Sequence, residues 1–216
     1  MKYNNWNDFF NNIPFTFFKT SLIQQKYIET IYEETPVFGK ILEIAGGSGY
    51  TSAVIADFLR RKETSVTYSD LEPNLVNKVK EKFSSITNLK FTVADSYNLP
   101  FKNNEFDIIF HQGFLEHFSD AEIINLLIEQ SRVAKKIVFD VPNSRRWHKI
   151  QEFGNERFLT HEKWQHLVLQ AGLIIHKVTA RRFSNPWKRL IPEIIKDTEW
   201  FHRNFGESTI IVCGNL

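Results

Sequence analysis

The feature that most constrains the fold is an alternation of short apolar segments with longer amphipathic segments, which begins near residue 40. Strands separated by helices of ten or more residues pair in parallel, through crossovers that are almost always right-handed. The pattern therefore predicts an α/β protein with a doubly wound, mostly parallel sheet. The apolar segments predict strands at 40–45, 65–69, 89–94, 106–110, 136–141, 173–180 and 208–213, and helices at 51–61, from Pro73, at 121–134 and at 160–171.

Composition and charge exclude several classes of function. With 27 basic and 25 acidic residues the formal net charge is +2, so no bulk field favours nucleic acid or an anionic membrane. The single cysteine, Cys213, rules out an intramolecular disulfide framework and a cysteine-based zinc site. The N-terminus lacks the apolar core of a signal peptide, and no apolar run approaches the roughly 18 residues of a membrane span. We expect a cytoplasmic protein with no membrane partner and no metal.

A glycine-rich loop follows the first predicted strand, with the sequence Glu43-Ile-Ala-Gly-Gly-Ser-Gly49. Glycines permit positive φ and a close approach of the backbone to a ligand, and the following helix start offers unpaired N–H groups. Such a loop can hold a carboxylate, a ribose or a phosphate. Glu43 would repel a pyrophosphate but suits an ammonium group, and a dinucleotide fingerprint would need Gly where Ser52 stands. A tight turn without a ligand is the alternative interpretation.

Two further acids follow the next two predicted strands. Asp70 comes directly after residues 65–69, where an acid can accept hydrogen bonds from both hydroxyls of a ribose. Asp95 follows residues 89–94 and could accept from an exocyclic amine such as that of adenine. Each alone is typical of a turn or cap. The acids Glu43, Asp70 and Asp95 at three successive strand ends favour a nucleoside site at one edge of the sheet.

These segments together resemble the class I S-adenosylmethionine-dependent methyltransferases, in particular the small-molecule-type members with a Leu-Glu-His motif. The matching blocks are ILEIAGGSG, VTYSDLEP and VADSYNLPFKNNEFDIIFHQGFLEHF. The resemblance covers about residues 38–180 and implies a seven-stranded, Rossmann-like methyltransferase fold whose last two strands are antiparallel. We expect residues 1–35 to form a helical N-terminal cap and residues 36–216 to form the methyltransferase domain, with a lid-like insertion at about 181–207.

The resemblance also implies which residues bind S-adenosylmethionine and its product S-adenosylhomocysteine. The loop and Glu43 would line the methionine end, Asp70 would bind the ribose, Leu71 and Asp95 would contact the adenine, and residues after the fourth strand would lie near the transferred methyl group. Ala45 stands where the family usually has Gly, and a positive φ there would cost on the order of 1 kcal/mol. The full set is Glu43, Ala45, Gly47, Gly49, Asp70, Leu71, Asp95, Ser96, His111 and Gln112.

The implied reaction is an in-line methyl transfer to a small, partly apolar acceptor. A general base is needed only if the acceptor must lose a proton, and His111 and His117 are the candidates because histidine titrates near neutral pH. The aromatic residues of the first 18 positions, which include Trp6 and Phe9, would give an apolar pocket that excludes water.

Other functions stay open at this point. An RNA or protein methyltransferase is favoured by the basic and aromatic residues at 181–189, and a non-catalytic S-adenosylmethionine-binding subunit is favoured by Ala45. An NAD-dependent dehydrogenase is disfavoured by Ser52 and by Glu43. The five-residue spacing of His161 and His166 does not suit a metal site, so we interpret them as surface and helix-start residues.

Overall fold

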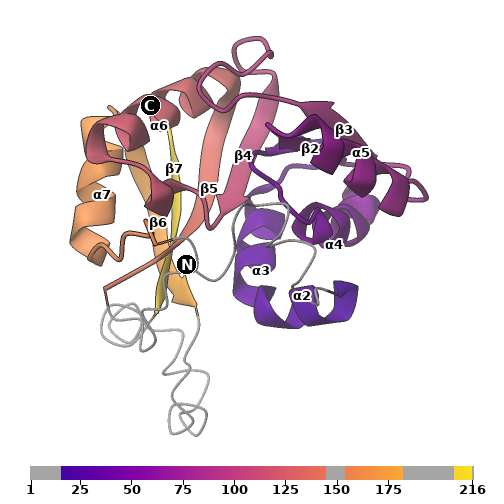
Figure 1. Ribbon diagram of the computed structural model, residues 1–216, viewed down its shortest axis with the longest axis horizontal. Helices are drawn as coiled ribbons and strands as arrows, with labels where there is room; N and C mark the ends of the chain where they lie inside the picture. Colours follow the sequence, from indigo (N-terminus) through magenta and orange to yellow (C-terminus); the bar gives the residue numbers. More distant parts are fainter. Residues whose placement is uncertain (1–15, 145–153, 182–206, 216) are drawn as a thin grey trace, which may run out of the picture.

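A seven-stranded sheet forms the centre of the computed structural model, which describes residues 16–144, 154–181 and 207–215 (Figure 1). The strand order is β3-β2-β1-β4-β5-β7-β6. The first five strands pair in parallel, whereas β7 is antiparallel to both β5 and β6. The predicted doubly wound, mostly parallel sheet is confirmed. The strands are β1 Lys40–Glu43, β2 Ser65–Asp70, β3 Leu89–Val93, β4 Phe106–Gln112, β5 Ala134–Pro142, β6 Ile174–Arg181 and β7 Ser208–Gly214.

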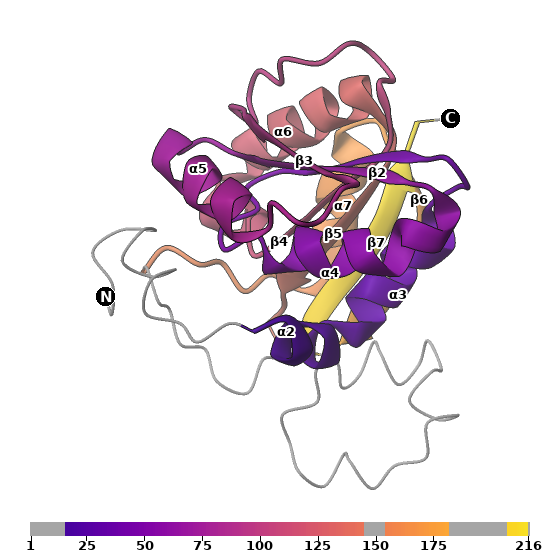
Figure 2. The ribbon, with the colours of Figure 1, turned by 90° about the vertical axis from the view of Figure 1, so that its right-hand side faces the viewer.

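Helices cover both faces of the sheet, as Figures 1 and 2 show. Helices α3, α4 and α5 share one apolar cluster with Ile41, Phe110 and Val138. Helices α6 and α7 pack on the opposite face, against Ile137 and Phe139. The described helices are α2 Phe17–Ile23, α3 Gln25–Glu34, α4 Tyr50–Leu59, α5 Pro73–Lys82, α6 Asp120–Val133 and α7 His161–Gln170, with 3₁₀ turns η1 Arg60–Lys62 and η2 Leu115–His117.

Local sequence signals fix several helix starts. Ser119 and Glu122 form a capping box before α6, which satisfies two N–H groups reciprocally. Thr160 caps α7 by accepting from the Lys163 N–H, and Pro73 occupies the first turn of α5. Every helix predicted after residue 40 begins within one or two residues of the position expected from the sequence.

Helix α3 runs antiparallel to β5 and is anchored to it at two levels. Near its C-terminus, the Glu34 carboxylate pairs with Lys136 at 2.6 Å. Further toward its N-terminus, the Tyr27 hydroxyl donates to the carbonyl of His111 at 2.6 Å and to that of Val138 at 3.3 Å. The start of α3, together with α2, therefore lies toward the carboxyl ends of β4 and β5 (Figure 1).

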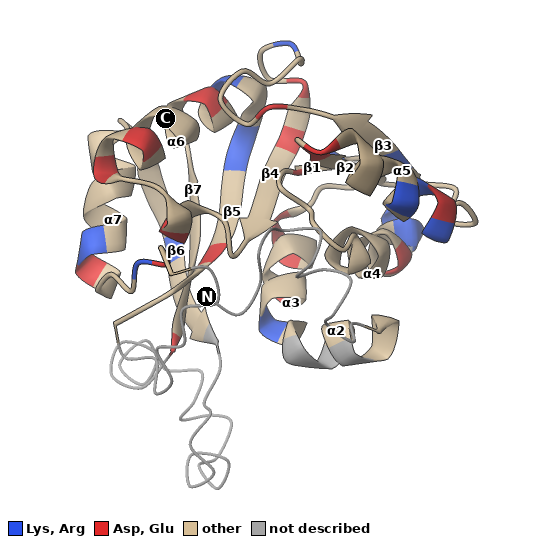
Figure 3. Cartoon of the chain, in the orientation of Figure 1, with Lys and Arg blue, Asp and Glu red and all other residues tan. Residues whose placement is uncertain are grey.

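Parts of the predicted cap and insertion lie outside the described residues. Residues 1–15 of the cap and 182–206 of the insertion are among them, so the division at residue 35 stays a prediction. In the described segments no helix has the length and apolar character needed to cross a membrane. Acidic and basic side chains are interspersed over the same segments (Figure 3).

Candidate cofactor site

The loop between β1 and α4 is a tight, strained turn. Ala45, Gly47 and Gly49 all have positive φ, at 49°, 54° and 71°. The loop is tied to β2 by the Gly46 N–H, which donates to the Ser69 carbonyl at 3.0 Å. Because an L-residue in the left-handed region costs roughly 1–2 kcal/mol, Ala45 holds this conformation against its own preference. Ala45, which stands where the family usually has Gly, therefore adopts a backbone conformation that favours glycine.

The Tyr68 side chain of β2 packs against this loop, a contact that the sequence did not predict. Its side chain is fully buried and its hydroxyl donates to the Gly47 carbonyl at 2.8 Å. The ring lies so close to Gly46 that a Cβ there would be 2.6 Å from Tyr68 Cδ2 and closer still to Cε2. The alternation of Val66 and Tyr68 on one face of β2 was the available signal, because it places the ring among inward-facing residues.

Asp70 points toward the glycine loop. Its Oδ2 accepts from the Gly47 N–H at 3.0 Å and its Oδ1 accepts from the Glu72 N–H at 3.2 Å. Burial raises the pKa of this carboxyl, and the N–H groups of Gly47, Glu72 and Leu71 oppose that rise. A carboxylate has about four lone-pair sites, so these contacts leave acceptor capacity for a diol.

Glu43 is buried at the start of the loop and faces the first turn of α4. Its Oε2 accepts from the Ser52 N–H at 3.1 Å and also from the Ser52 hydroxyl. Burial raises the pKa of Glu43 to about 8; the bonds from Ser52 oppose the rise and the negative charge of Asp70 adds to it. A cation placed beside this carboxyl would lower its pKa again, because it favours the charged form.

The ends of β2 and β3 expose apolar side chains around Asp95. Leu71 is 66% exposed, Val93 44% and Tyr97 45%. Asp95 and Ser96 lie between Val93 and Tyr97 in the chain. The Asp95 carboxylate accepts from the Tyr97 N–H at 2.9 Å, which is the turn geometry that the sequence left open.

His111 lies on the opposite side of the sheet from the loop. Its side chain is fully buried, 3.2 Å from Gln130 Oε1 on α6 and stacked on Phe139 with ring centroids 5.6 Å apart. Burial lowers its pKa to about 3, so the imidazole is neutral at physiological pH. The alternation along β4 turns this side chain toward α6, and the expected position of His111 near the transferred methyl group stays a prediction.

The other histidine candidate, His117, lies in η2. Its Nδ1 is 2.9 Å from Asn155 Oδ1, in the segment that precedes α7. The neighbouring Arg157 N–H donates to the Glu116 carbonyl at 2.9 Å, so this segment is fastened along the turn. The contact gives His117 a structural partner.

Gln112 and a second residue that the sequence analysis missed, Asp140, lie at the carboxyl ends of β4 and β5. They are direct neighbours in the ladder, and Gln112 Nε2 donates to Asp140 Oδ2 at 2.8 Å. The Asp140 side chain is 2% exposed. The signal was the acid in the otherwise apolar strand Lys-Ile-Val-Phe-Asp-Val, since a buried acid requires a polar partner.

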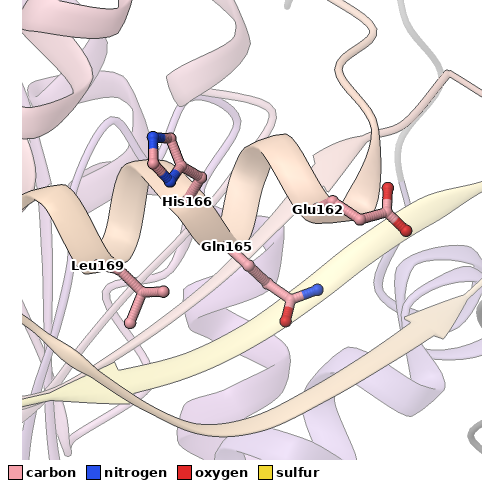
Figure 4. Close-up of a pocket in the computed structure, with 4 residues that line it drawn as sticks. All are labelled: Glu162, Gln165, His166 and Leu169. Atoms are coloured by element: carbon pink, nitrogen blue, oxygen red, sulfur yellow. The ribbon is translucent and has the colours of Figure 1, made fainter.

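The interpretation of His161 as a surface residue was wrong. It begins α7, as predicted, but it is buried, 2.7 Å from Thr209 Oγ1 and 3.3 Å from Asn143 Nδ2. Packing of α7 onto β5 and β7 encloses it. His166 lines a shallow depression along α7 with Glu162, Gln165 and Leu169 (Figure 4), and this depression contains no residue of the strand ends.

Comparison with known proteins shows similarity to methyltransferases. Residues 41–136 match the family model described as a methyltransferase domain. A 72-residue stretch is 38% identical to the ubiquinone/menaquinone biosynthesis C-methyltransferase UbiE of Rickettsia bellii and covers 31% of this chain and 29% of that protein. A 121-residue stretch is 31% identical to the hybrid PKS-NRPS synthetase pydA of Acremonium sp and covers 56% of this chain and 3% of that protein.

The fold extends the likeness beyond these segments. A crystal structure of a SAM-dependent methyltransferase from Aquifex aeolicus superposes with a TM-score of 0.64 at 15% identity, over 92% of this chain and 98% of the other. The chain spans less than a third of the length of the curated relatives named above. The similarity therefore does not assign the activities of those complete proteins to this chain.

Residues 41–136 therefore resemble a methyltransferase domain. The seven-stranded sheet has the fold of a SAM-dependent methyltransferase, with the Asp70 carboxylate beside the glycine loop.

Proposed function

We propose that this protein transfers a methyl group from S-adenosylmethionine to a small, partly apolar acceptor. The observation that carries the proposal is the Asp70 carboxylate, held by the N–H groups of Gly47 and Glu72 at the edge of the glycine loop. Two backbone donors fix its orientation while acceptor capacity is left for a vicinal diol. A ribose bound there would place the rest of the cofactor along the strand ends on either side.

The adenine end is supported by exposed apolar surface. Leu71 and Val93 follow or end neighbouring strands and are largely exposed, which a flat aromatic base would cover. Asp95 and Ser96 would then lie at the edge of the base. The apolar contact would supply binding energy, and the polar groups would fix the orientation of the ring.

The methionine end is supported by Glu43 and the start of α4. The buried Glu43 carboxyl and the positive end of the helix suit the ammonium and carboxylate groups of an amino acid, respectively. S-adenosylmethionine supplies an activated methyl group on a sulfonium, so the protein's task is to orient the two reactants and exclude water. Correct placement alone can account for roughly 7–11 kcal/mol of the barrier.

A small acceptor is supported by the relatives. The UbiE name denotes a C-methyltransferase of quinone biosynthesis, and the pydA name denotes a synthetase of the polyketide and peptide type. Both names concern small molecules. Helices α2 and α3 reach the carboxyl ends of β4 and β5, where they would help to enclose an acceptor of that size.

The test uses S-adenosylmethionine labelled in its methyl group. The protein is incubated with a small-metabolite fraction, with total RNA and with a protein extract, and the label is followed in each. We expect label in the small-metabolite fraction alone. Transfer into RNA or protein, or binding of the cofactor without any transfer, would contradict the proposal and would favour the two alternatives that the sequence left open.

A further inference from the structure

At the carboxyl ends of β4 and β5, a layer of polar side chains lies directly beyond the apolar core. Phe110 and Val138 are neighbours in the ladder and belong to the cluster beneath α3 and α4. Two residues further along each strand, on the same face, are Gln112 and Asp140. Because side chains alternate with a period of two, this pair points to the side of α3 and α4, just beyond the last apolar layer.

The side chains of the helix segment that covers this face also change from apolar to polar beside Gln112 and Asp140. Tyr27 is level with His111 and Val138, because its hydroxyl bonds both carbonyls. Gln24 lies about one helical turn before it, a distance of roughly 5 Å that equals about one and a half strand residues. Gln24 is therefore level with Gln112 and Asp140, and its Oε1 accepts from the Thr51 hydroxyl of α4 at 3.0 Å.

Thr20 lies in α2, before the turn at Gln24 that separates α2 from α3. The Gln24 N–H donates to the Thr20 carbonyl, and the Ile28 N–H donates to that of Gln24, so backbone hydrogen bonds run through this turn. Ile28 belongs to the core cluster under α3. The Thr20 side chain is 3% exposed, and among the described residues its Oγ1 has no hydrogen-bond partner. Since buried hydroxyls are normally bonded, this oxygen is available to a polar group that enters beside α2.

We infer that this polar layer is the methyl-acceptor site and that the Asp140 carboxylate takes the proton from a protic acceptor, a hydroxyl or an amine. The inference rests on the proposed function. The acceptor oxygen or nitrogen attacks the methyl carbon, the carbon–sulfur bond breaks with its electron pair left on sulfur, and the O–H or N–H proton passes to Asp140. The products are the methylated acceptor and S-adenosylhomocysteine, and no other reactant is needed. Gln112, which donates to Asp140 Oδ2, is a positioning residue for the carboxylate.

Among the described residues, three other titratable groups near these strand ends occupy different positions. His111 is enclosed on the α6 side of the sheet, and His117 lies in η2 against Asn155. Glu43 is bonded to Ser52 at the end of β1, whereas Asp140 lies near the carboxyl end of β5, the strand to which Tyr27 of α3 is bonded. Asp140 thus combines a carboxylate with a position on the face that the helices cover.

The test compares the intact protein with Asp140→Asn and with Asp107→Asn as a matched control. Asp107 is also an aspartate on the central strands, but it binds Lys135 and the Lys40 N–H at the amino end of β4. S-adenosylhomocysteine binding is measured by calorimetry for all three. Transfer of labelled methyl is then measured on a fixed panel of phenol, catechol, aniline and benzylamine, with kcat and KM determined against pH.

We expect all three proteins to bind S-adenosylhomocysteine with affinities within about threefold of one another, and label to appear in at least one panel compound. Asp140→Asn should lower kcat by about 100-fold or more, while Asp107→Asn keeps it. The inference is overturned if the protein binds S-adenosylhomocysteine but labels no panel compound, or if Asp140→Asn retains kcat. Absence of binding to the intact protein would instead refute the proposed function.

Discussion

Gly46 is the position at which the glycine loop and the sheet are packed most tightly, and Gly46→Ala tests that contact. An added Cβ would lie 2.6 Å from Tyr68 Cδ2, closer to Cε2, and 3.1 Å from Glu43 Oε2, whereas carbon atoms prefer roughly 3.5–4.0 Å. The ring cannot move freely, because it is fully buried and its hydroxyl holds the Gly47 carbonyl. Overpacking of this kind costs about 1–3 kcal/mol, and loss of the hydrogen bond adds about 1 kcal/mol.

The assay is thermal unfolding followed by calorimetry. A loss of about 3 kcal/mol lowers Tm by roughly 6–12 °C in a protein of this size. Gly172→Ala is the control, because Gly172 has a φ of 77° but, apart from its chain neighbours, no atom of the described residues lies within 4 Å of an added Cβ. Only backbone strain of about 1 kcal/mol is therefore expected. The Gly46→Ala effect should largely disappear in a Tyr68→Ala background. An equal loss in both backgrounds would refute the steric reasoning.

Two further predictions concern the same loop. Ala45→Gly should raise the free energy of unfolding by about 1 kcal/mol, measured by urea denaturation, because φ is 49° at this position; a loss of stability would contradict the strain. Glu43→Gln should remove a pH dependence of the free energy of unfolding. Because the pKa of Glu43 is raised to about 8, the folded state binds this proton more tightly than the unfolded state does. The contribution of Glu43 to stability therefore falls as pH rises from about 4.5 to 8. The stability of the native protein relative to Glu43→Gln should therefore decrease from pH 5 to pH 8, and a constant difference would contradict the shift.

The strands and helices after residue 40 could be predicted from periodicity and capping, because those signals are local. Pro73 and Thr160 mark helix starts through their own backbone and side-chain chemistry. The acids at the strand ends could also be located, because the sequence indicates both the end of the strand and the start of the loop at Glu43 and Asp70. The structure places the Asp70 carboxylate against the glycine loop, where it accepts from the Gly47 N–H.

The residues that were missed depend on neighbours distant in the sequence. Tyr68 meets Gly46 and Gly47 only because β2 pairs with β1, and Asp140 meets Gln112 only through the register of β4 and β5. The direction of the His111 side chain depends on which face of β4 is covered by α6, and the sequence does not encode that locally. The φ of Ala45 likewise follows from the loop's ties to β2, which no local propensity encodes.

The central claim is that Asp70 binds the ribose hydroxyls of the cofactor, and titration calorimetry with S-adenosylhomocysteine tests it most directly. The intact protein should bind with a micromolar Kd, and Asp70→Ala should weaken binding by roughly 10–100-fold, the effect of losing charge-assisted hydrogen bonds. Asp57→Ala, which removes an exposed carboxylate paired with Arg60 on the outside of α4, should leave the Kd unchanged. No heat of binding to the intact protein, or equal affinity after Asp70→Ala, would contradict the account.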